Sequence, residues 1–130
     1  MRTVLLLVAL FVCQMLSAQE NIAGHPRLLL KAGEEARIKE MIAEDEAMAR
    51  VHGAILAECD EILDLPVLER VMEGKRLLHT SREALKRIFW FSYSYRMTGN
   101  EAYADRAIDE MLAVSAFSDW NPSHFLDVGE

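Results

Sequence analysis

The fold is decided by residues 81–116, which read SREALKRIFWFSYSYRMTGNEAYADRAIDEMLAVSA. Ser81 suits a helix start, because a serine side chain accepts hydrogen bonds from the first free amides of a helix. Gly99 suits the left-handed conformation that closes a helix, and Asn100 can cap the helix that follows. The pattern therefore predicts two antiparallel helices, one beginning at Ser81 and one over Glu101–Ala116, joined by a tight turn.

Apolar residues recur at helical spacing in both arms of this hairpin. The first arm is apolar over most of its circumference, as expected of a deeply buried helix. Aromatic residues at this spacing are ordinary core residues, and lining a sugar cleft is the alternative for Trp90, Tyr93 and Tyr95. The expected inner side of the first arm comprises Leu85, Ile88, Phe89, Ser92, Tyr95 and Arg96, and that of the second arm comprises Tyr103, Ala107, Met111 and Val114.

Two further helices are predicted upstream of this hairpin. One should run over residues 32–43 and the other over residues 45–63, where Asp45 is a suitable N-cap. Pro66 prevents the second of them from continuing. Helical hairpins joined by short connections fit an all-α toroid or a solenoid. Because we find no second copy of any repeat, the solenoid is the weaker interpretation of this all-α chain.

The charge of the chain limits its partners. The 130 residues carry a formal net charge of −7, and an acidic chain is a poor non-specific binder of nucleic acid, so no nucleic-acid partner is expected. One basic group stands out against this average. It is most simply a solvated helix flank, and an anion-binding rim is the alternative. Its members are Lys75, Arg76, Arg82, Lys86 and Arg87.

Residues 1–18 have the pattern of a secretory signal peptide. Arg2 supplies the positive start, and the apolar run Val4–Leu16 leads to small residues before a cut ahead of Gln19. The run is shorter than the roughly 20 residues that a membrane-spanning helix needs, so no stable membrane insertion is expected after cleavage. We expect an exported protein, periplasmic or extracellular, whose formal charge changes from −7 to −8 when Arg2 is lost. Cys59 is then the sole cysteine, so no intrachain disulfide can form.

Residues 119–130, which read DWNPSHFLDVGE, combine aromatic, amide, imidazole and carboxylate groups. Asn121 precedes a proline and is expected to be extended, and the following proline–serine pair suits a helix entrance. In that helix, His124 and Asp127 lie three residues apart on one face. The polar groups of such an entrance commonly satisfy one another, and contact with a substrate is the alternative.

Four segments together resemble heparinase II/III-type polysaccharide lyases. They are residues 25–29, residues 87–99, the pair Tyr103-Ala104 and residues 119–130, of which the last is the most specific. The resemblance implies an N-terminal incomplete (α/α) toroid, followed by a β-sandwich domain that this sequence does not contain. It also implies cleavage of uronic-acid polysaccharides, such as heparin or heparan sulfate, by β-elimination.

The resemblance further implies where this chain would lie in such a lyase. Residues 19–130 are expected to form the N-terminal part of the toroid domain, truncated before the catalytic Asn, His and Tyr groups of the family. No catalytic residue is therefore assigned, and the fragment alone is expected to be inactive. Trp120, Asn121 and His124 are candidate substrate-binding residues at the edge of the cleft.

The expected partner is an anionic uronic-acid polysaccharide, and neither a cofactor nor a metal ion is expected for these residues. A secreted, non-enzymatic helical-repeat binding module is the alternative from a different functional class. Further toroid helices bearing Asn, His and Tyr in the sequence that follows would favour the lyase, and regular repeats would favour the binding module.

Overall fold

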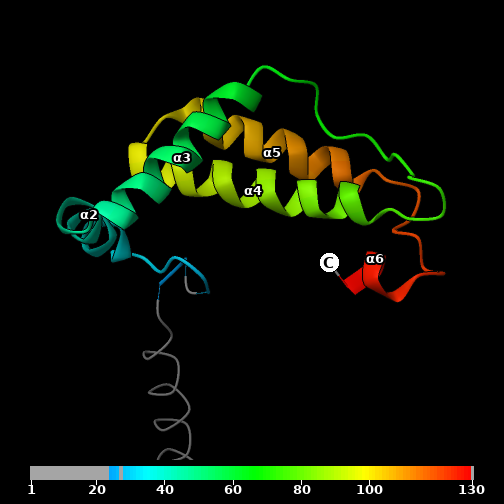
Figure 1. Ribbon diagram of the computed structural model, residues 1–130, viewed down its shortest axis with the longest axis horizontal. Coiled ribbons are helices and arrows are strands. Elements are labelled where there is room, and N and C mark those ends of the chain that lie inside the picture. Colours follow the sequence, from blue (N-terminus) through cyan, green and yellow to red (C-terminus); the bar gives the residue numbers. More distant parts are fainter. Residues whose placement is uncertain (1–23, 27, 130) are drawn as a thin grey trace, which may run out of the picture. The chain divides into compact units, whose positions relative to one another are not determined.

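A computed structural model describes residues 24–26 and 28–129 of the protein. This part of the chain contains five helices and no β-strand, which confirms the all-α prediction (Figure 1). None of its helices combines the length and the apolar character that crossing a membrane requires. The signal-peptide prediction for residues 1–18 lies outside the described residues, as does Glu130.

The chain forms two compact units, with the boundary after Glu35. In the first, the Ala32 N–H donates to the Pro26 carbonyl oxygen at 3.1 Å, which closes the loop ahead of the first helix. That helix, α2, covers Glu34–Glu44 and buries none of its residues. It begins two residues later than predicted and carries acidic residues in its first turn, where the helix dipole favours negative charge.

Helix α3 covers Glu46–Ile62 and ends one residue earlier than predicted. Asp45 caps it, as the sequence predicts. The Asp45 Oδ1 atom accepts from the Ala47 N–H at 2.7 Å and from the Met48 N–H at 3.3 Å. These bonds satisfy two of the amides that have no partner within a first helical turn.

The predicted hairpin is formed by α4 (Leu78–Thr98) and α5 (Glu101–Ser115), which lie antiparallel and side by side (Figure 1). Gly99 takes the left-handed conformation, with φ of 77°, and its N–H donates to the Tyr95 carbonyl oxygen at 2.7 Å. The Asn100 side chain accepts from an amide in the first turn of α5 at 3.2 Å. The predicted roles of Gly99 and Asn100 are both confirmed.

The prediction that Ser81 caps α4 is wrong, because α4 begins three residues earlier, at Leu78. The buried Ser81 hydroxyl lies 3.3 Å from the Leu77 carbonyl oxygen and 3.2 Å from that of Asp127, either of which can accept its proton. Leu77 occupies the N-cap position, and its own N–H donates to Asp127 Oδ2 at 2.8 Å. The start of α4 is thus satisfied by a residue 50 positions away, which no local pattern reveals.

The core of the second unit lies where α3, α4 and α5 meet. The ring of Phe91 is fully buried and lies 6.2 Å from that of Tyr103, between centroids. Trp90 packs against this core from its edge, which favours packing over cleft lining for that residue. The buried cluster comprises Cys59, Ile62, Phe91, Tyr103 and Ala107, with Ile55, Leu56, Leu63 and Trp90 packed against it.

The prediction of which side of α4 is buried is wrong. Leu85, Phe89 and Tyr95 are 40%, 49% and 41% exposed. A helix that is apolar on most sides has no unique inner face in its sequence, and in this unit its neighbours cover one face only. The buried residues of α4 are Thr80, Ser81, Ala84, Phe91, Ser94 and Met97.

The loop between α3 and α4 runs back along the hairpin to the start of α4 (Figure 1). It turns sharply at Gly74, where φ is 62°, and Glu73 and Arg76 exchange backbone hydrogen bonds of 2.8 Å and 3.1 Å across the turn. The last helix, α6 (Phe125–Gly129), lies against α4. The loops before α4 and before α6 thereby meet, and their contact forms the candidate site.

Candidate functional site

Polar contacts join residues 119–127 to residues 70–81, and we call these two segments together the terminal clasp. At one end of it, Arg70 holds Asp119 through two bonds. Arg70 Nη2 lies 2.7 Å from Asp119 Oδ1, and Arg70 Nε donates to the Asp119 carbonyl oxygen at 3.0 Å. This pair is partly exposed, so solvent weakens its contribution.

Asp127 lies at the centre of the terminal clasp and is fully buried. Its Oδ2 accepts from the Leu77 N–H at 2.8 Å and from Asn121 Nδ2 at 2.6 Å, and its Oδ1 accepts from Arg76 Nε at 3.1 Å. Burial alone raises the pKa of Asp127, but the hydrogen bonds from Leu77, Asn121 and Arg76 outweigh it and lower the pKa to about 2. The carboxylate is therefore a charged structural group that orients its neighbours.

Asn121 is also an internal part of the terminal clasp, with an exposed fraction of 8%. Its φ is 51°, so the prediction of extended geometry is wrong. Asparagine tolerates this left-handed region because its short polar side chain can bond locally. Its N–H donates to Asp119 Oδ1 at 2.7 Å, its Oδ1 accepts from Ser123 Oγ at 2.9 Å, and its Nδ2 also donates to the Lys75 carbonyl oxygen at 3.0 Å.

Trp120 and His124, the other two candidate residues, are both partly exposed. The Trp120 ring packs against Phe117, with centroids 5.2 Å apart. The His124 ring stacks on Phe125 at 5.6 Å and 10°. The structure thus brings Trp120, Asn121 and His124 into one loop but presents only the first and the last at the surface. Their contact with a substrate remains a prediction.

The predicted neighbours His124 and Asp127 do lie close together, with His124 Nδ1 at 3.7 Å from Asp127 Oδ1. That distance is too long for a hydrogen bond, so the two side chains are not joined in the way proposed for a helix entrance. The helix itself begins at Phe125, and the preceding proline–serine pair forms a turn. The His124 N–H closes that turn onto the Asn121 carbonyl oxygen at 2.9 Å.

Three members of the basic group are engaged in ion pairs within the chain. Arg76 bonds the buried Asp127, and Arg87 Nη1 lies 2.9 Å from Glu110 Oε1. Lys86 Nζ lies 2.9 Å from Glu83 and 3.2 Å from Glu58, and the hydrogen bond with Glu83 is the main cause of its raised pKa. These pairs favour a structural role for Arg76, Lys86 and Arg87 over the anion-binding rim.

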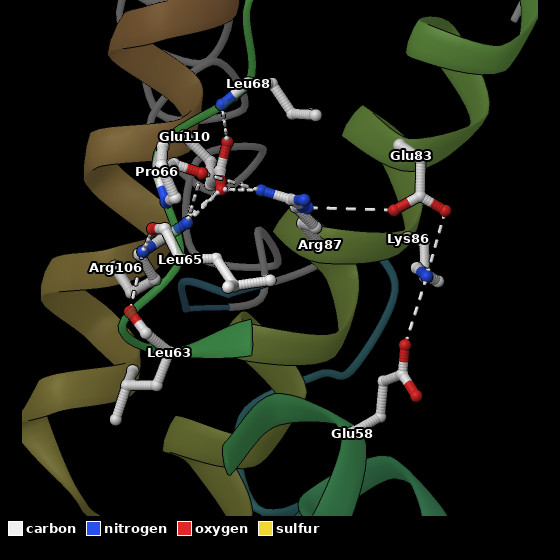
Figure 2. A network of polar contacts seen from close by, with 10 residues as sticks. All are labelled: Glu58, Leu63, Leu65, Pro66, Leu68, Glu83, Lys86, Arg87, Arg106 and Glu110. Carbon is white, nitrogen blue, oxygen red and sulfur yellow. Dashed lines mark hydrogen bonds and ion pairs between the residues drawn. The ribbon is translucent and has the colours of Figure 1, made fainter. Parts of the chain in front are cut away.

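A second buried carboxylate, Glu110, was not recognised from the sequence. Figure 2 shows it between Arg87 of α4 and Arg106 of α5. Glu110 Oε1 accepts from Arg106 Nη2 at 2.8 Å and from Arg87 Nη1 at 2.9 Å, and Oε2 accepts from the Leu68 N–H at 3.0 Å. Burial alone raises the pKa of Glu110, but the bonds from Leu68, Arg106 and Arg87 outweigh it and lower the pKa.

Arg106 extends this network to the loop that follows α3 (Figure 2). Its Nη1 donates to the Leu63 carbonyl oxygen at 2.6 Å and to that of Leu65, and its Nη2 donates to that of Pro66 at 3.1 Å. These carbonyl groups lie at and beyond the end of a helix, where partners within the helix run out. Arg106 and Glu110 of α5 therefore both bond the backbone of the loop that follows α3 and hold it against α5.

One sequence signal for this network was present. Positions 103, 107, 110 and 114 form a continuous helical stripe, and an acid on an apolar stripe indicates a buried, paired carboxylate. The prediction instead placed Met111 on the inner side, and Met111 is 44% exposed, whereas Glu110 is fully buried.

A shallow groove of about 570 Å³ lies between the α3–α4 loop and α4. Glu69 and Glu73 line it from the loop, and His79, Glu83 and Arg87 line it from α4. Because Arg87 is paired with Glu110, the charges of Glu69 and Glu73 give the groove an acidic character, which is unsuited to a uronate polymer. Within the described residues, no group of three or more His, Cys, Asp or Glu side chains could hold a metal ion.

No protein-family model and no curated protein matches this chain.

Proposed function

We propose that residues 19–130 are the N-terminal part of an (α/α) toroid in an exported polysaccharide lyase of the heparinase II/III type. The sequence resemblance is the basis of this proposal. The all-α architecture supports it, because the antiparallel α4 and α5 form the kind of helical hairpin from which toroids are built. A uronic-acid polysaccharide of the heparin or heparan sulfate kind is the proposed substrate.

The terminal clasp is the structural observation that supports the proposal. Its buried residues Asn121 and Asp127 hold the family-like motif against the hairpin, while Trp120 and His124 remain at the surface. The indole offers an apolar face to a sugar ring, and the imidazole can donate a hydrogen bond to a carboxylate or hydroxyl group. We assign Trp120 and His124 to substrate contact, and Asn121 to the positioning of Trp120.

The proposed reaction is a β-elimination. A base removes the proton from C5 of the uronate, the electron pair forms the C4–C5 double bond, and the C4–O bond breaks as an acid protonates the departing sugar. Neutralising the uronate carboxylate stabilises the enolate-like charge that develops, and matched proton donors assist the transfers. None of these transfers is assigned to a described residue, since Trp120 and His124 hold the polymer rather than move its protons.

The test expresses the complete gene product that contains this chain and measures unsaturated uronate products from heparin-like, chondroitin-like and alginate polymers. Product from the heparin-like polymer supports the proposal. Trp120→Ala and His124→Ala should each lower the depolymerisation rate by about threefold to tenfold, the order of one lost ring or hydrogen-bond contact. The matched control is Phe89→Ala, which removes an exposed aromatic residue of α4 that has no proposed contact with a sugar and should leave the rate unchanged.

Two results would remove the proposal. One is a stably folded protein that releases no unsaturated product from any of the three polymers. If that protein still binds a polymer, the helical-repeat binding module replaces the lyase. The other is an unchanged rate in a folded Trp120→Ala, His124→Ala double variant, which would withdraw the assignment of these residues to substrate contact.

A further inference from the structure

Polar groups attach residues 119–127 to the rest of the second unit. Asp127 bonds Arg76 and the amide of Leu77, and its carbonyl oxygen lies 3.2 Å from the Ser81 hydroxyl. Asn121 reaches the Lys75 carbonyl oxygen, as described above. These bonds converge on one short stretch of loop, at the point where α4 begins.

The Trp120 ring packs on Phe117, in the loop just before this segment, and the apolar side chains of α6 contribute little to its attachment. Phe125, Leu126 and Val128 of α6 are 79%, 43% and 54% exposed. The buried apolar cluster of the unit, in contrast, is built from residues of α3, α4 and α5. The terminal segment is thus held by electrostatic bonds to a body that is held by apolar packing.

We propose that the terminal clasp is a latch, in which residues 119–129 open as a unit while α3, α4 and α5 stay folded. Segments with few buried apolar contacts open locally at a lower free energy than the core does. Here the buried carboxylate of Asp127 holds the latch closed, because it bonds both the loop side chain Arg76 and the amide of Leu77, the N-cap residue of α4.

Opening has a defined structural consequence. It separates the Arg76 guanidinium and the Leu77 amide from the carboxylate that they share at the start of α4. It also releases Trp120 and His124 from their fixed positions on the surface. For these two residues the consequence rests on the proposed function, whereas the opening itself is measured without any substrate.

The test is amide hydrogen exchange on the full chain, compared with Asp127→Asn. Asparagine has the same shape but a single acceptor oxygen, so it cannot bond both the Leu77 amide and Arg76 in either orientation. The amides of Asn121, His124 and Asp127 report on the terminal segment, since each donates within it. Amides near the middle of α4 and α5 report on the body.

We expect the Asp127→Asn change to speed exchange of the terminal amides by about tenfold or more, the order expected when bonds to a buried charged group are lost. Exchange in α4 and α5 should stay within about twofold of the unmodified chain, since most helical stability comes from packing. The matched control is Asp109→Asn, which makes the same chemical change at an exposed position of α5 and should alter neither set.

Two outcomes overturn the latch. Equal acceleration in both sets would show that the terminal segment and the body unfold together. Unchanged exchange of the terminal amides would show that Asp127 does not hold the segment closed. If Asp127→Asn does not fold, Arg76→Gln is the second test. It removes only the Arg76 bond to Asp127 and should accelerate exchange of the terminal amides without affecting α4 and α5.

Discussion

Replacing Glu110 by glutamine should strongly destabilise the second unit. In the native structure, the fully buried carboxylate accepts from Arg87, Arg106 and the Leu68 amide. Glutamine keeps one acceptor oxygen and turns a second acceptor into a donor that faces a cation or an amide. The substitution therefore removes the carboxylate paired with the largely buried Arg106 guanidinium, and it leaves Arg87 with Glu83, at 3.7 Å, as its counter-charge.

The magnitude follows from the burial. Removing one partner of a buried ion pair costs about 3–5 kcal/mol, because the remaining charge is desolvated without compensation. A small domain has a total stability of roughly 5–15 kcal/mol, so the loss is a large fraction of it. We expect Glu110→Gln to lower the free energy of unfolding by about 3 kcal/mol, the lower end of that range, since Arg106 keeps its carbonyl partners.

Urea unfolding followed by far-UV circular dichroism measures this difference, provided that the slope against urea is the same for both proteins. Asp109→Asn is the control, because it neutralises an exposed acid one position away and should change the stability by less than about 0.5 kcal/mol. A loss below about 1 kcal/mol for Glu110→Gln would refute the reasoning, since it would equal that of an ordinary neutral hydrogen bond.

Three further predictions concern single contacts. The folded pKa of Asp127, about 2, lies below its ordinary value of 3.8. The stability that this group contributes is therefore complete above about pH 3.8 and is lost as the pH falls towards 2. Denaturation midpoints measured against pH should show this loss, and Asp127→Asn should abolish it. The Tyr103 hydroxyl donates to Asp60 Oδ1 at 2.5 Å, which raises its pKa to about 12. Ultraviolet titration should therefore show a late ionisation that Asp60→Asn shifts to lower pH. Gly99→Ala should lower the free energy of unfolding by about 1 kcal/mol, because φ is 77°. Gly53→Ala, inside α3 with open space around it, should raise that free energy by about 0.5–1 kcal/mol. Changes of the same sign in urea unfolding would contradict the backbone argument.

Signals that act over a few residues were predictable from the sequence. Asp45 caps α3, Gly99 closes α4 and Asn100 caps α5, because each of them bonds a backbone amide or carbonyl group within four positions. The number and approximate ends of the main helices follow from the same local rules. The sequence also identified residues 119–127 as chemically unusual, and His124 and Asp127 as spatial neighbours.

Features that depend on partners far along the chain were not predictable. Ser81 resembles an N-cap in its local sequence, yet the start of α4 is satisfied by Asp127. Asn121 precedes a proline, yet its side-chain bonds hold it in the left-handed region. The local preference in each case is worth about 1–2 kcal/mol, which bonds to a buried charge can exceed.

By itself, the sequence determined that this chain is helical, where its hairpin turns and which residues bring unusual chemistry to its end. Only the tertiary structure decided which of those residues are internal and which are presented. Asn121 and Asp127 are buried because a desolvated amide and carboxylate need several partners, and the loop before α4 supplies them. Trp120 and His124 stay partly exposed because their rings pack on neighbours in the same stretch of chain, Phe117 and Phe125, rather than in the buried cluster.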